Sequence, residues 1–388
     1  MGASAESATV RVLSSITDVD AGEWDAPVRD NYPFLWHAFL AALEAHHCVG
    51  TDSGWVPRHL AHFRNDRLVG AMPLFEKYNS WGEFVFDHAW ADAYERYGME
   101  YYPKLVNAIP FTPASGQRVL LDSENEAEIA GLLVAAANKL VKDAGYSGIH
   151  TLFPGERDFT LLNRGGAVSR NDCQFHWHNR GYRGFEDFLE ALKSRKRKKI
   201  RQERRRVDQA GLEIQRLTGE SASEEDWRDF TRLYRSIYNR KYGLPAFNLG
   251  FFMEVAATLG RQIHLVLARE QGHSVAGALM YSDDNTLYGR HWGCENYVDC
   301  LHFELCYYQG IELCLEAGLD RFDPGAQGEH KIARGFEAHR TRSLHWMAES
   351  PFNQAIRRFV DSEQAGVSRY IDQVRAHSPF RSEHEIIH

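Results

Sequence analysis

The sequence predicts an α/β protein of the α+β kind, in which one plan of strands and helices occurs in two domains. A chain of 388 residues is long for a single hydrophobic core and comfortable for two. Its content of 44% hydrophobic and 25% charged residues is that of an ordinary globular protein. A hairpin pattern occurs near residue 60 and again about two hundred residues later. We therefore predict a first domain at 1–165 and a second at 166–388, with a helical insertion between their hairpins.

The first copy of the plan begins with a helix at 40–47 and a hairpin at 59–74. In the hairpin, short apolar runs flank a polar turn that contains Asn65 and Asp66. The elements predicted to follow are a strand at 84–86, a helix at 101–107, a loop with Pro and Gly at 110–118, an amphipathic helix at 129–144 and a strand at 148–153. The domain is predicted to end near Gly165 and Gly166.

The second copy begins with a hairpin whose apolar runs lie at 264–268 and 275–281. Its Gly277 corresponds to Gly70 in the first copy, and a glycine in a strand lets another backbone or a ligand approach closely. The elements predicted to follow are a strand at 287–292, a helix at 302–317, a strand at 318–322 and a Gly-rich loop at 322–336. Since the order of elements is the same, we expect 59–118 and 264–330 to superpose.

Helices are predicted for the insertion and for the C-terminus. At 185–192 the apolar residues are spaced for one helix face. A basic helix follows at 195–206, where nine Lys/Arg and one Glu give a local charge of 9 − 1 = +8. The whole chain carries −8, so the remainder carries −8 − 8 = −16. Further helices are predicted at 224–239, 251–259 and 353–376, the last docked on the second domain.

Three interpretations of the basic helix compete: a solvated face, a membrane-surface patch and a phosphate-binding site. A membrane patch needs an apolar face opposite the cations, and only Ile200 and Val207 offer one. An acidic body would repel a polyanion that does not meet the basic strip, so phosphate binding fits best and RNA is the obvious polyanion. No RNA-recognition motif with paired aromatics is present, so contacts to the phosphate backbone are expected. The predicted phosphate-binding residues are Arg195, Lys196, Lys198, Lys199 and Arg201.

Composition and motifs exclude several classes. No apolar run approaches the roughly 20 residues that a membrane helix needs. Residues 1–10 lack the basic and apolar regions of a signal peptide, so we predict a cytoplasmic protein. The six cysteines show no CxxC pair and no zinc-ligand spacing, so no metal is predicted. The chain has no GxSxG, no Walker loop and no strand-linked GxGxxG.

The Gly-rich loop at 322–336 is the candidate site. Its three glycines, Gly325, Gly328 and Gly335, allow tight turns, and cations beside such turns often hold an anion. A charged surface loop would have a similar composition, so that alternative stays open. Acyl transfer to an amine needs an activated ester, an oxyanion donor and a proton acceptor, but no protein nucleophile. The candidate acceptors are Glu329, His330 and His291, although a histidine at the end of a strand is often structural.

Several long motifs carry a family resemblance. The run 173–182, the segment from Phe185 to Arg201, the segments 101–105 and 110–113, and the Gly-rich 325–331 resemble the FemAB-like predicted N-acyltransferases. The resemblance covers nearly the whole chain and implies two tandem GNAT-like domains, the fold of acyl-CoA N-acyltransferases. The better-known Fem transferases move amino acids from aminoacyl-tRNA to the cell-wall (peptidoglycan) precursor peptide, and their basic helical arm engages tRNA. The present sequence has one short basic helix in the place of such an arm.

We therefore predict an acyltransferase that forms an amide on an amine acceptor, either a small molecule or a peptide. The expected acyl donor is aminoacyl-tRNA, and the rival donor is acyl-CoA. A GNAT-fold protein that only binds a peptide or a cell-wall fragment is the alternative outside enzymes. The Gly325–Gly335 loop would form the active cleft with residues at 290–292, and two cations of the first domain would help to hold an anionic acceptor. The predicted substrate-binding residues are Lys104, Arg118, Arg290, Trp292, Gln327, Lys331 and Arg334.

Overall fold

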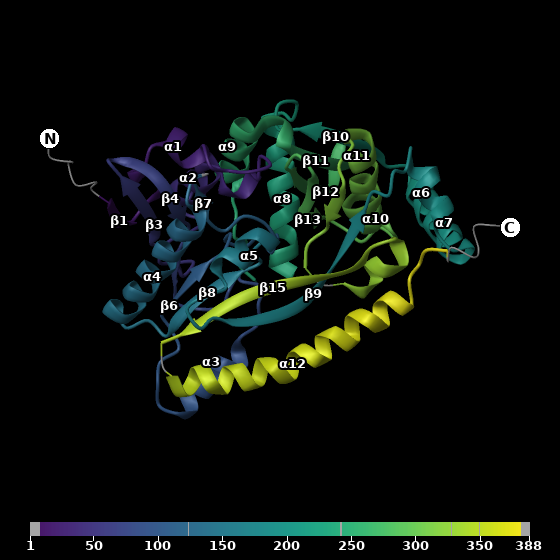
Figure 1. The fold of residues 1–388 in the computed structure, drawn as a ribbon. Coiled ribbons are helices and arrows are strands. Elements are labelled where there is room, and N and C mark those ends of the chain that lie inside the picture. The colour runs from purple at the N-terminus through teal and green to yellow at the C-terminus, as the bar shows by residue number, and fades with distance from the viewer. Residues whose placement is uncertain (1–7, 123, 241–242, 327, 349, 382–388) are drawn as a thin grey trace. The chain divides into compact units, whose positions relative to one another are not determined.

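The computed structural model describes residues 8–122, 124–240, 243–326, 328–348 and 350–381 (Figure 1). By its internal contacts the chain divides into two compact units. The first comprises residues 1–172 and 341–368, and the second comprises 173–340 and 369–388. The first unit therefore includes a segment that follows the second unit in sequence, which differs from the predicted domains at 1–165 and 166–388.

Strand β15 (Glu337–Met347) and helix α12 (Ser350–Ala376) explain this return of the chain. The second half of β15 pairs antiparallel with β8 (Gly148–Leu152), from Ser343 opposite Leu152 to Met347 opposite Gly148. The start of α12 buries Phe352, Ile356 and Val360 against Trp90 and Tyr94. The predicted helix at 353–376 is confirmed, but the prediction that it docks on the second domain is wrong for its residues up to 368.

The first unit contains a mixed set of strands with helices packed on them. Its remaining strands are β1 (Ala8–Leu13), β2 (Trp55–Pro57), β3 (His59–Arg64), β4 (Arg67–Met72), β5 (Phe75–Lys77), β6 (Lys104–Asn107), β7 (Leu120–Leu121) and the start of β9 (Val168–His178). Its remaining helices are η1 (Ile16–Asp18), α1 (Ala21–Asp25), η2 (Pro33–Leu35), α2 (His37–Ala45), α3 (His88–Arg96), α4 (Glu126–Ala144) and α5 (Glu156–Leu162). The strand order is β1-β3-β4-β7 in one sheet, and β15, β8, β6, β5 and β2 are neighbours in that order in another. Helix α4 packs on β3 and β4 (Figure 1).

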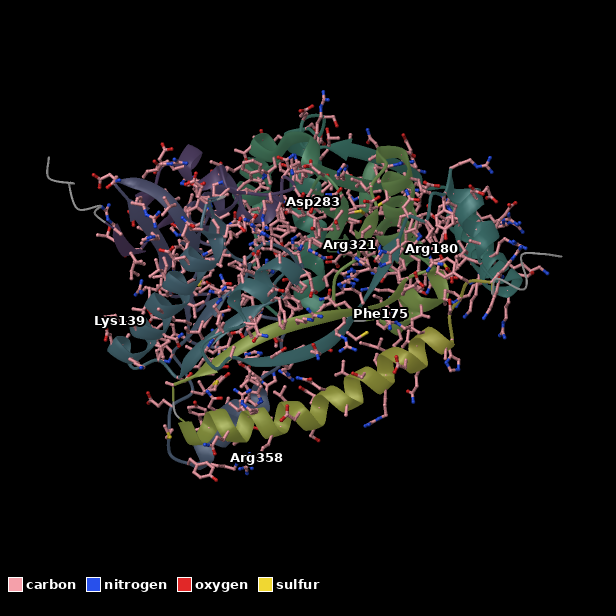
Figure 2. The ribbon with its side chains drawn as sticks, viewed as in Figure 1. Lys139, Phe175, Arg180, Asp283, Arg321 and Arg358 are labelled. Carbon is pink, nitrogen blue, oxygen red and sulfur yellow. The ribbon has the colours of Figure 1, made fainter. Side chains whose placement is uncertain are left out.

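The second unit has the strand order β10-β11-β12-β13-β14-β9. Its strands are β10 (Glu213–Thr218), β11 (Ile263–Glu270), β12 (His273–Ser282), β13 (Thr286–Cys294) and β14 (Arg321–Asp323), with the end of β9. Its helices are α6 (Phe185–Ala191), α7 (Ser194–Gln209), α8 (Glu224–Arg240), α9 (Leu249–Leu259), η3 (Gly260–Gln262), α10 (Leu301–Phe303), η4 (Glu304–Tyr308, a π-helix), α11 (Gln309–Ala317) and η5 (Glu329–Arg334). Helix α8 packs on β12 and β13 (Figure 1). The parallel pair β13–β14 is joined by Arg321, labelled in Figure 2, which donates to Thr286 Oγ1 at 3.0 Å.

One plan does occur twice, but the predicted alignment of its later elements is wrong. The hairpins β3–β4 and β11–β12 match as predicted. Residues 101–107 contain the strand β6 instead of a helix, and 84–86 are not a strand. The counterpart of α11 and β14 is α4 followed by β8, because β8 is parallel to β6 as β14 is parallel to β13. The loop that matches Pro324-Gly325 is therefore Pro154-Gly155, not 110–118.

The two hairpin glycines make room for helices that are not counterparts. A Cβ on Gly70 would lie 2.4 Å from Cγ2 of Ile129 on α4. A Cβ on Gly277 would lie 3.0 Å from Cδ2 of Phe230 on α8. In both strands the glycine leaves room for a side chain of the helix, whereas we predicted approach of a backbone or a ligand. The predicted match of Gly70 with Gly277 is wrong by one residue, because both hairpins have two-residue turns, from Arg64 to Arg67 and from Glu270 to His273, and this places Gly70 opposite Ala276 in the alignment.

The interior of the first unit holds a chain of buried polar groups. Lys104, with no exposed side-chain surface, pairs with Glu83 at 2.9 Å and with Asp87. Asp87 accepts a 2.5 Å hydrogen bond from the Tyr101 hydroxyl. The Nδ1 atoms of His150 and His345 lie 2.6 Å apart. Burial holds the pKa of both imidazoles well below the usual value, and the charge of Lys104 adds to the effect on His150.

We expect acid to destabilise the first unit, because these two imidazoles bind protons more readily in the unfolded chain. Their folded pKa lies below the unfolded value of about 6.5, so their stability contribution is present above that pH. It is lost as the pH falls below it, at up to about 1.4 kcal/mol per pH unit for each group. The measurement is the melting temperature between about pH 7.5 and 5.5.

Two matched variants test whether the buried histidine pair causes this loss of stability in acid. His345→Asn should reduce the pH dependence, whereas His88→Asn, on the exposed face of α3, should leave it unchanged. Equal pH dependence in the two variants would contradict the assignment to the buried pair.

Candidate active site

The Gly-rich loop begins at a buried ion pair. The Arg290 guanidinium lies 2.7 Å from Asp323, and both side chains are almost fully buried. Burial raises the pKa of Asp323, but Arg290 and His176 more than offset this, so the carboxyl is held far below its ordinary pKa. Asp323 also accepts a 2.9 Å hydrogen bond from the Gly325 amide. Arg290 therefore holds the loop, and its occupied side chain does not fit the predicted substrate-binding role.

Lys331 closes the loop from within. Its Nζ donates to the Gly325 carbonyl at 2.7 Å and the residue is 2% exposed. Burial lowers the pKa of Lys331 to about 8. Gly328 has a φ of 103°, and a Cβ there would lie 2.6 Å from Cε1 of His330, so this turn requires glycine. The loop is thus built around internal contacts of Lys331, which leave it no exposed ammonium for a substrate anion.

His330 is the exposed imidazole of the loop, and it is paired with Tyr307. Its Nε2 lies 2.8 Å from the Tyr307 hydroxyl, which comes from the π-helix η4. Such π-helical turns are frequent at functional sites. Burial and the charges of Arg334 and Lys331 lower the pKa of His330, so the ring is neutral at pH 7. A neutral imidazole can accept a proton from an amine.

Half-buried aromatic groups surround this pair. The His302 ring lies 5.3 Å from that of Tyr307 and 6.3 Å from that of His330. Trp292, a predicted substrate-binding residue, lies edge-on to His302 at 5.1 Å. Burial lowers the pKa of His302 to about 4. We call Trp292, His302, Tyr307 and His330 the His330 site.

Arg334 is buried beneath this site. Its guanidinium donates to Glu203 on α7 at 2.7 Å and to the His330 carbonyl at 2.6 Å. It also lies over the Phe303 ring, 3.3 Å from the centroid. With only 3% of its side chain exposed, Arg334 does not fit the predicted anion-binding role. It is a support of the loop.

The other two predicted proton acceptors, His291 and Glu329, have partners other than Tyr307. His291 sits among the rings of Tyr234, Phe247, Phe252 and Tyr281. Burial lowers its pKa to about 3, so it is a neutral structural group. Glu329 is exposed and accepts a 2.7 Å hydrogen bond from Tyr370. Gln327 lies outside the described residues.

The two cations predicted in the first unit are structural. Lys104 is the centre of the buried ion cluster described above. Arg118 is 1% exposed and donates to the carbonyls of Leu152, Gln117 and Ala114 at 2.5–2.7 Å. Neither side chain fits the predicted task of holding an anionic acceptor, because both are enclosed by their internal partners.

The basic helix forms as predicted, as α7. It buries Ile200, Glu203 and Val207. Of the predicted phosphate-binding residues, Arg195, Lys198, Lys199 and Arg201 are exposed and Lys196 is half-buried. Arg201 pairs with Glu186, and Lys199 lies 3.8 Å from Glu203. The exposed face of α7 is therefore strongly basic.

Three residues of the site region escaped the sequence analysis: Tyr307, His302 and Glu203. Tyr307 and His302 lie in a predicted helix, where aromatic side chains are expected in the core. Glu203 did carry a signal, because it is the one acid in the basic run.

Among the described residues, no group of three or more His, Cys, Asp or Glu is arranged to hold a metal ion. No helix in the described part of the chain is long and apolar enough to cross a membrane.

Comparisons with known proteins support the predicted fold. The chain matches a FemAB-like family described as peptidoglycan biosynthesis/recognition over residues 15–382. No curated protein sequence matches. A crystal structure of FemX is similar, with 13% identity, 87% of this chain and 98% of that chain covered, and a TM-score of 0.50. The C-terminal domain of a putative lysylphosphatidylglycerol synthetase from Agrobacterium fabrum is also similar, with 10% identity, 88% and 96% covered, and a TM-score of 0.53.

A tandem GNAT protein of the clavulanic acid pathway is a weaker match, with 10% identity, 88% and 99% covered, and a TM-score of 0.44. The duplicated GNAT-like α/β fold that we predicted is confirmed.

Proposed function

Since the chain belongs to the FemAB-like family, we propose that it is an acyltransferase that forms an amide on an amine acceptor. The observation that carries the proposal is the exposed His330 imidazole on the Gly-rich loop, which lies 2.8 Å from the Tyr307 hydroxyl. As the acceptor we propose an amine of a peptidoglycan precursor peptide, because the family is described as peptidoglycan biosynthesis/recognition.

The proposed reaction joins the acceptor nitrogen to the acyl carbon of an ester. The new C–N bond forms, the ester C–O bond breaks, and the amine loses a proton. His330 would accept that proton, and the departing alkoxide would take it up as a hydroxyl. Tyr307, which is hydrogen-bonded to the same imidazole, would orient the ring. Its own pKa is raised by burial, so it stays protonated at neutral pH.

The proposed donor is aminoacyl-tRNA. The exposed cations of α7 support a polyanionic donor, because they form a basic strip on a chain whose remainder carries −8 − 8 = −16. Acyl-CoA is the rival donor, and a protein that only binds a peptide or cell-wall fragment is the alternative to an enzyme. Since aminoacyl-tRNA is a cytoplasmic substrate, the proposal includes a cytoplasmic protein.

We expect tRNA binding to weaken steeply with salt, with a log–log slope of about −0.7 to −0.9 for each phosphate contact. Changing Lys196, Lys198 and Lys199 to Glu should lower the affinity and flatten the slope, because those contacts are lost. The measurement is a salt titration of binding to unfractionated tRNA, with CoA as the competing ligand.

Charge reversal on another helix provides the control. Lys139→Glu with Lys142→Glu on the exposed face of α4 also makes the protein more acidic, but should leave the slope unchanged. Tight CoA binding without measurable tRNA binding would overturn the proposed donor. Failure of the wild type to turn over any acyl donor would leave the binding alternative.

A further inference from the structure

Glu203 is the one acid among the nine cations of the basic run, and it points inward. Its carboxylate accepts two hydrogen bonds from the Arg334 guanidinium, at 2.7 and 3.1 Å. It also accepts a hydrogen bond from the Tyr308 hydroxyl. A helix that served only to attract phosphate would gain nothing from this carboxylate, so its place in the run needs a second explanation.

The next residue, Arg204, makes a complementary set of contacts. It donates to Glu304 at 3.0 and 3.1 Å and to Glu312 at 2.6 Å. Glu304 is the first residue of the π-helix that carries Tyr307. Arg204 therefore ties α7 to the element that presents the tyrosine.

Glu203 ties the same helix to the other half of the pair. Its partner Arg334 donates to the backbone carbonyl of His330 at 2.6 Å, so it fixes the main chain that presents the imidazole. Two adjacent residues of opposite charge thus hold both partners of a hydrogen bond that joins Tyr307 to His330 at 2.8 Å. Bidentate Arg–carboxylate pairs impose geometry as well as attraction, which suits this task.

We propose that Glu203 and Arg204 are positioning residues, which make α7 the element that sets the geometry of the Tyr307–His330 pair. A polyanion on the outer cations of α7 would then act on the pair through the same helix. The role of the polyanion rests on the proposed function, whereas the positioning of His330 does not.

The positive electrostatic potential of α7 supports this coupling between a bound polyanion and the Tyr307–His330 pair. Lys196, one turn before Ile200, is half-buried and lies within electrostatic range of Arg334. A phosphate that neutralises Lys196 would therefore reduce the positive potential at the base of the loop as well as at the surface.

The first test needs no activity. His330 is observed by NMR in protein with isotope-labelled histidine, and a His330→Gln spectrum assigns its signal. Glu203→Gln should lower the apparent pKa of His330 by about half a unit or more, because the Arg334 charge beside it is then uncompensated. Arg204→Gln should shift the ring signal by moving η4. Asp208→Asn, which removes an exposed acid from the same helix, should do neither.

Addition of unfractionated tRNA should shift the His330 signal in the wild type and in Asp208→Asn, but much less in Glu203→Gln. An unshifted His330 signal in folded Glu203→Gln and Arg204→Gln proteins would overturn the positioning proposal. A tRNA-induced shift of equal size in all variants would overturn the coupling.

The second test separates positioning from a purely structural role. With an active donor, Glu203→Gln should lower kcat about tenfold or more with little change in the acceptor KM, because small misplacements of a catalytic group are costly. The double variant Glu203→Gln/Arg334→Gln removes both charges and should recover the melting temperature but not kcat. Recovery of kcat with stability would show that the pair is only structural. If the wild type lacks turnover, the proposed function fails, while the NMR result still decides the positioning.

Discussion

Replacing His330 with alanine is expected to lower kcat by about 10²–10⁴-fold, the usual loss when a positioned acid–base group is removed. The reason is geometric. His330 is an exposed, neutral imidazole whose Nε2 is held 2.8 Å from the Tyr307 hydroxyl. The measurement is steady-state kinetics with the acyl donor that the binding experiments identify. Tyr307→Phe should cost less, because the imidazole remains and only its orientation is relaxed.

This prediction depends on a folded variant, because Gly328 packs closely against the His330 ring. The melting temperature of His330→Ala should be compared with that of His377→Ala, an exposed histidine near the end of α12. A stable His330→Ala protein with unaltered kcat would remove His330 from the mechanism. The proton acceptor would then have to be sought at Glu329, the other exposed group of the loop.

The parts of the fold that the sequence predicts well have strong periodic patterns. The amphipathic pattern at 129–144 and the basic run at 195–206 both form helices, α4 and α7. The two hairpins form because polar turns interrupt apolar runs. These signals are local, so one sequence suffices to detect them.

The elements that were predicted wrongly have sequence patterns that fit more than one kind of secondary structure. Strand β6 has only four residues, all of them buried, including Lys104. So short a run has no period of its own and does not distinguish a strand from a helix. Phe84 and Phe86 alternate with buried neighbours as a strand would, but Phe84 has a φ of 59°. A left-handed residue of this size breaks a strand, and nothing in its side chain announces the conformation.

The candidate site shows a different limit. The sequence predicts a loop rich in glycine and charge, and the structure has one. The sequence does not show whether the side chain of a cation faces solvent or pairs with a carboxylate. Arg290 meets Asp323 from 33 residues away, and Arg334 meets Glu203 from 131 residues away. Such pairing depends on tertiary contacts. Most of the cations predicted to bind substrate, namely Lys104, Arg290 and Arg334, are paired with carboxylates in this way.

The largest stability effect is expected at Lys104. Lys104→Met should destabilise the first unit by about 3–5 kcal/mol, because it leaves the buried carboxylates of Glu83 and Asp87 without their partner. Burial lowers the pKa of Lys104, but these two carboxylates more than offset it, so the net shift is upward and the lysine is charged at neutral pH. Denaturant unfolding of the wild type and the variant measures the difference.

The pH dependence of that difference identifies its cause. Without Lys104, the buried carboxyls would have folded pKa values above their unfolded ones, so the folded variant would bind more protons than the unfolded chain. Its stability deficit should therefore be larger at about pH 7.5 than at about pH 5.5. The triple variant Lys104→Met/Glu83→Gln/Asp87→Asn should recover much of the loss, since the lysine and both of its buried carboxylate partners are removed together. Lys139→Met is the control. Figure 2 labels this lysine on α4, where its side chain is 76% exposed, and its loss should change little. A deficit of Lys104→Met that is independent of pH, and that the triple variant does not relieve, would point to lost packing rather than to unpaired charge.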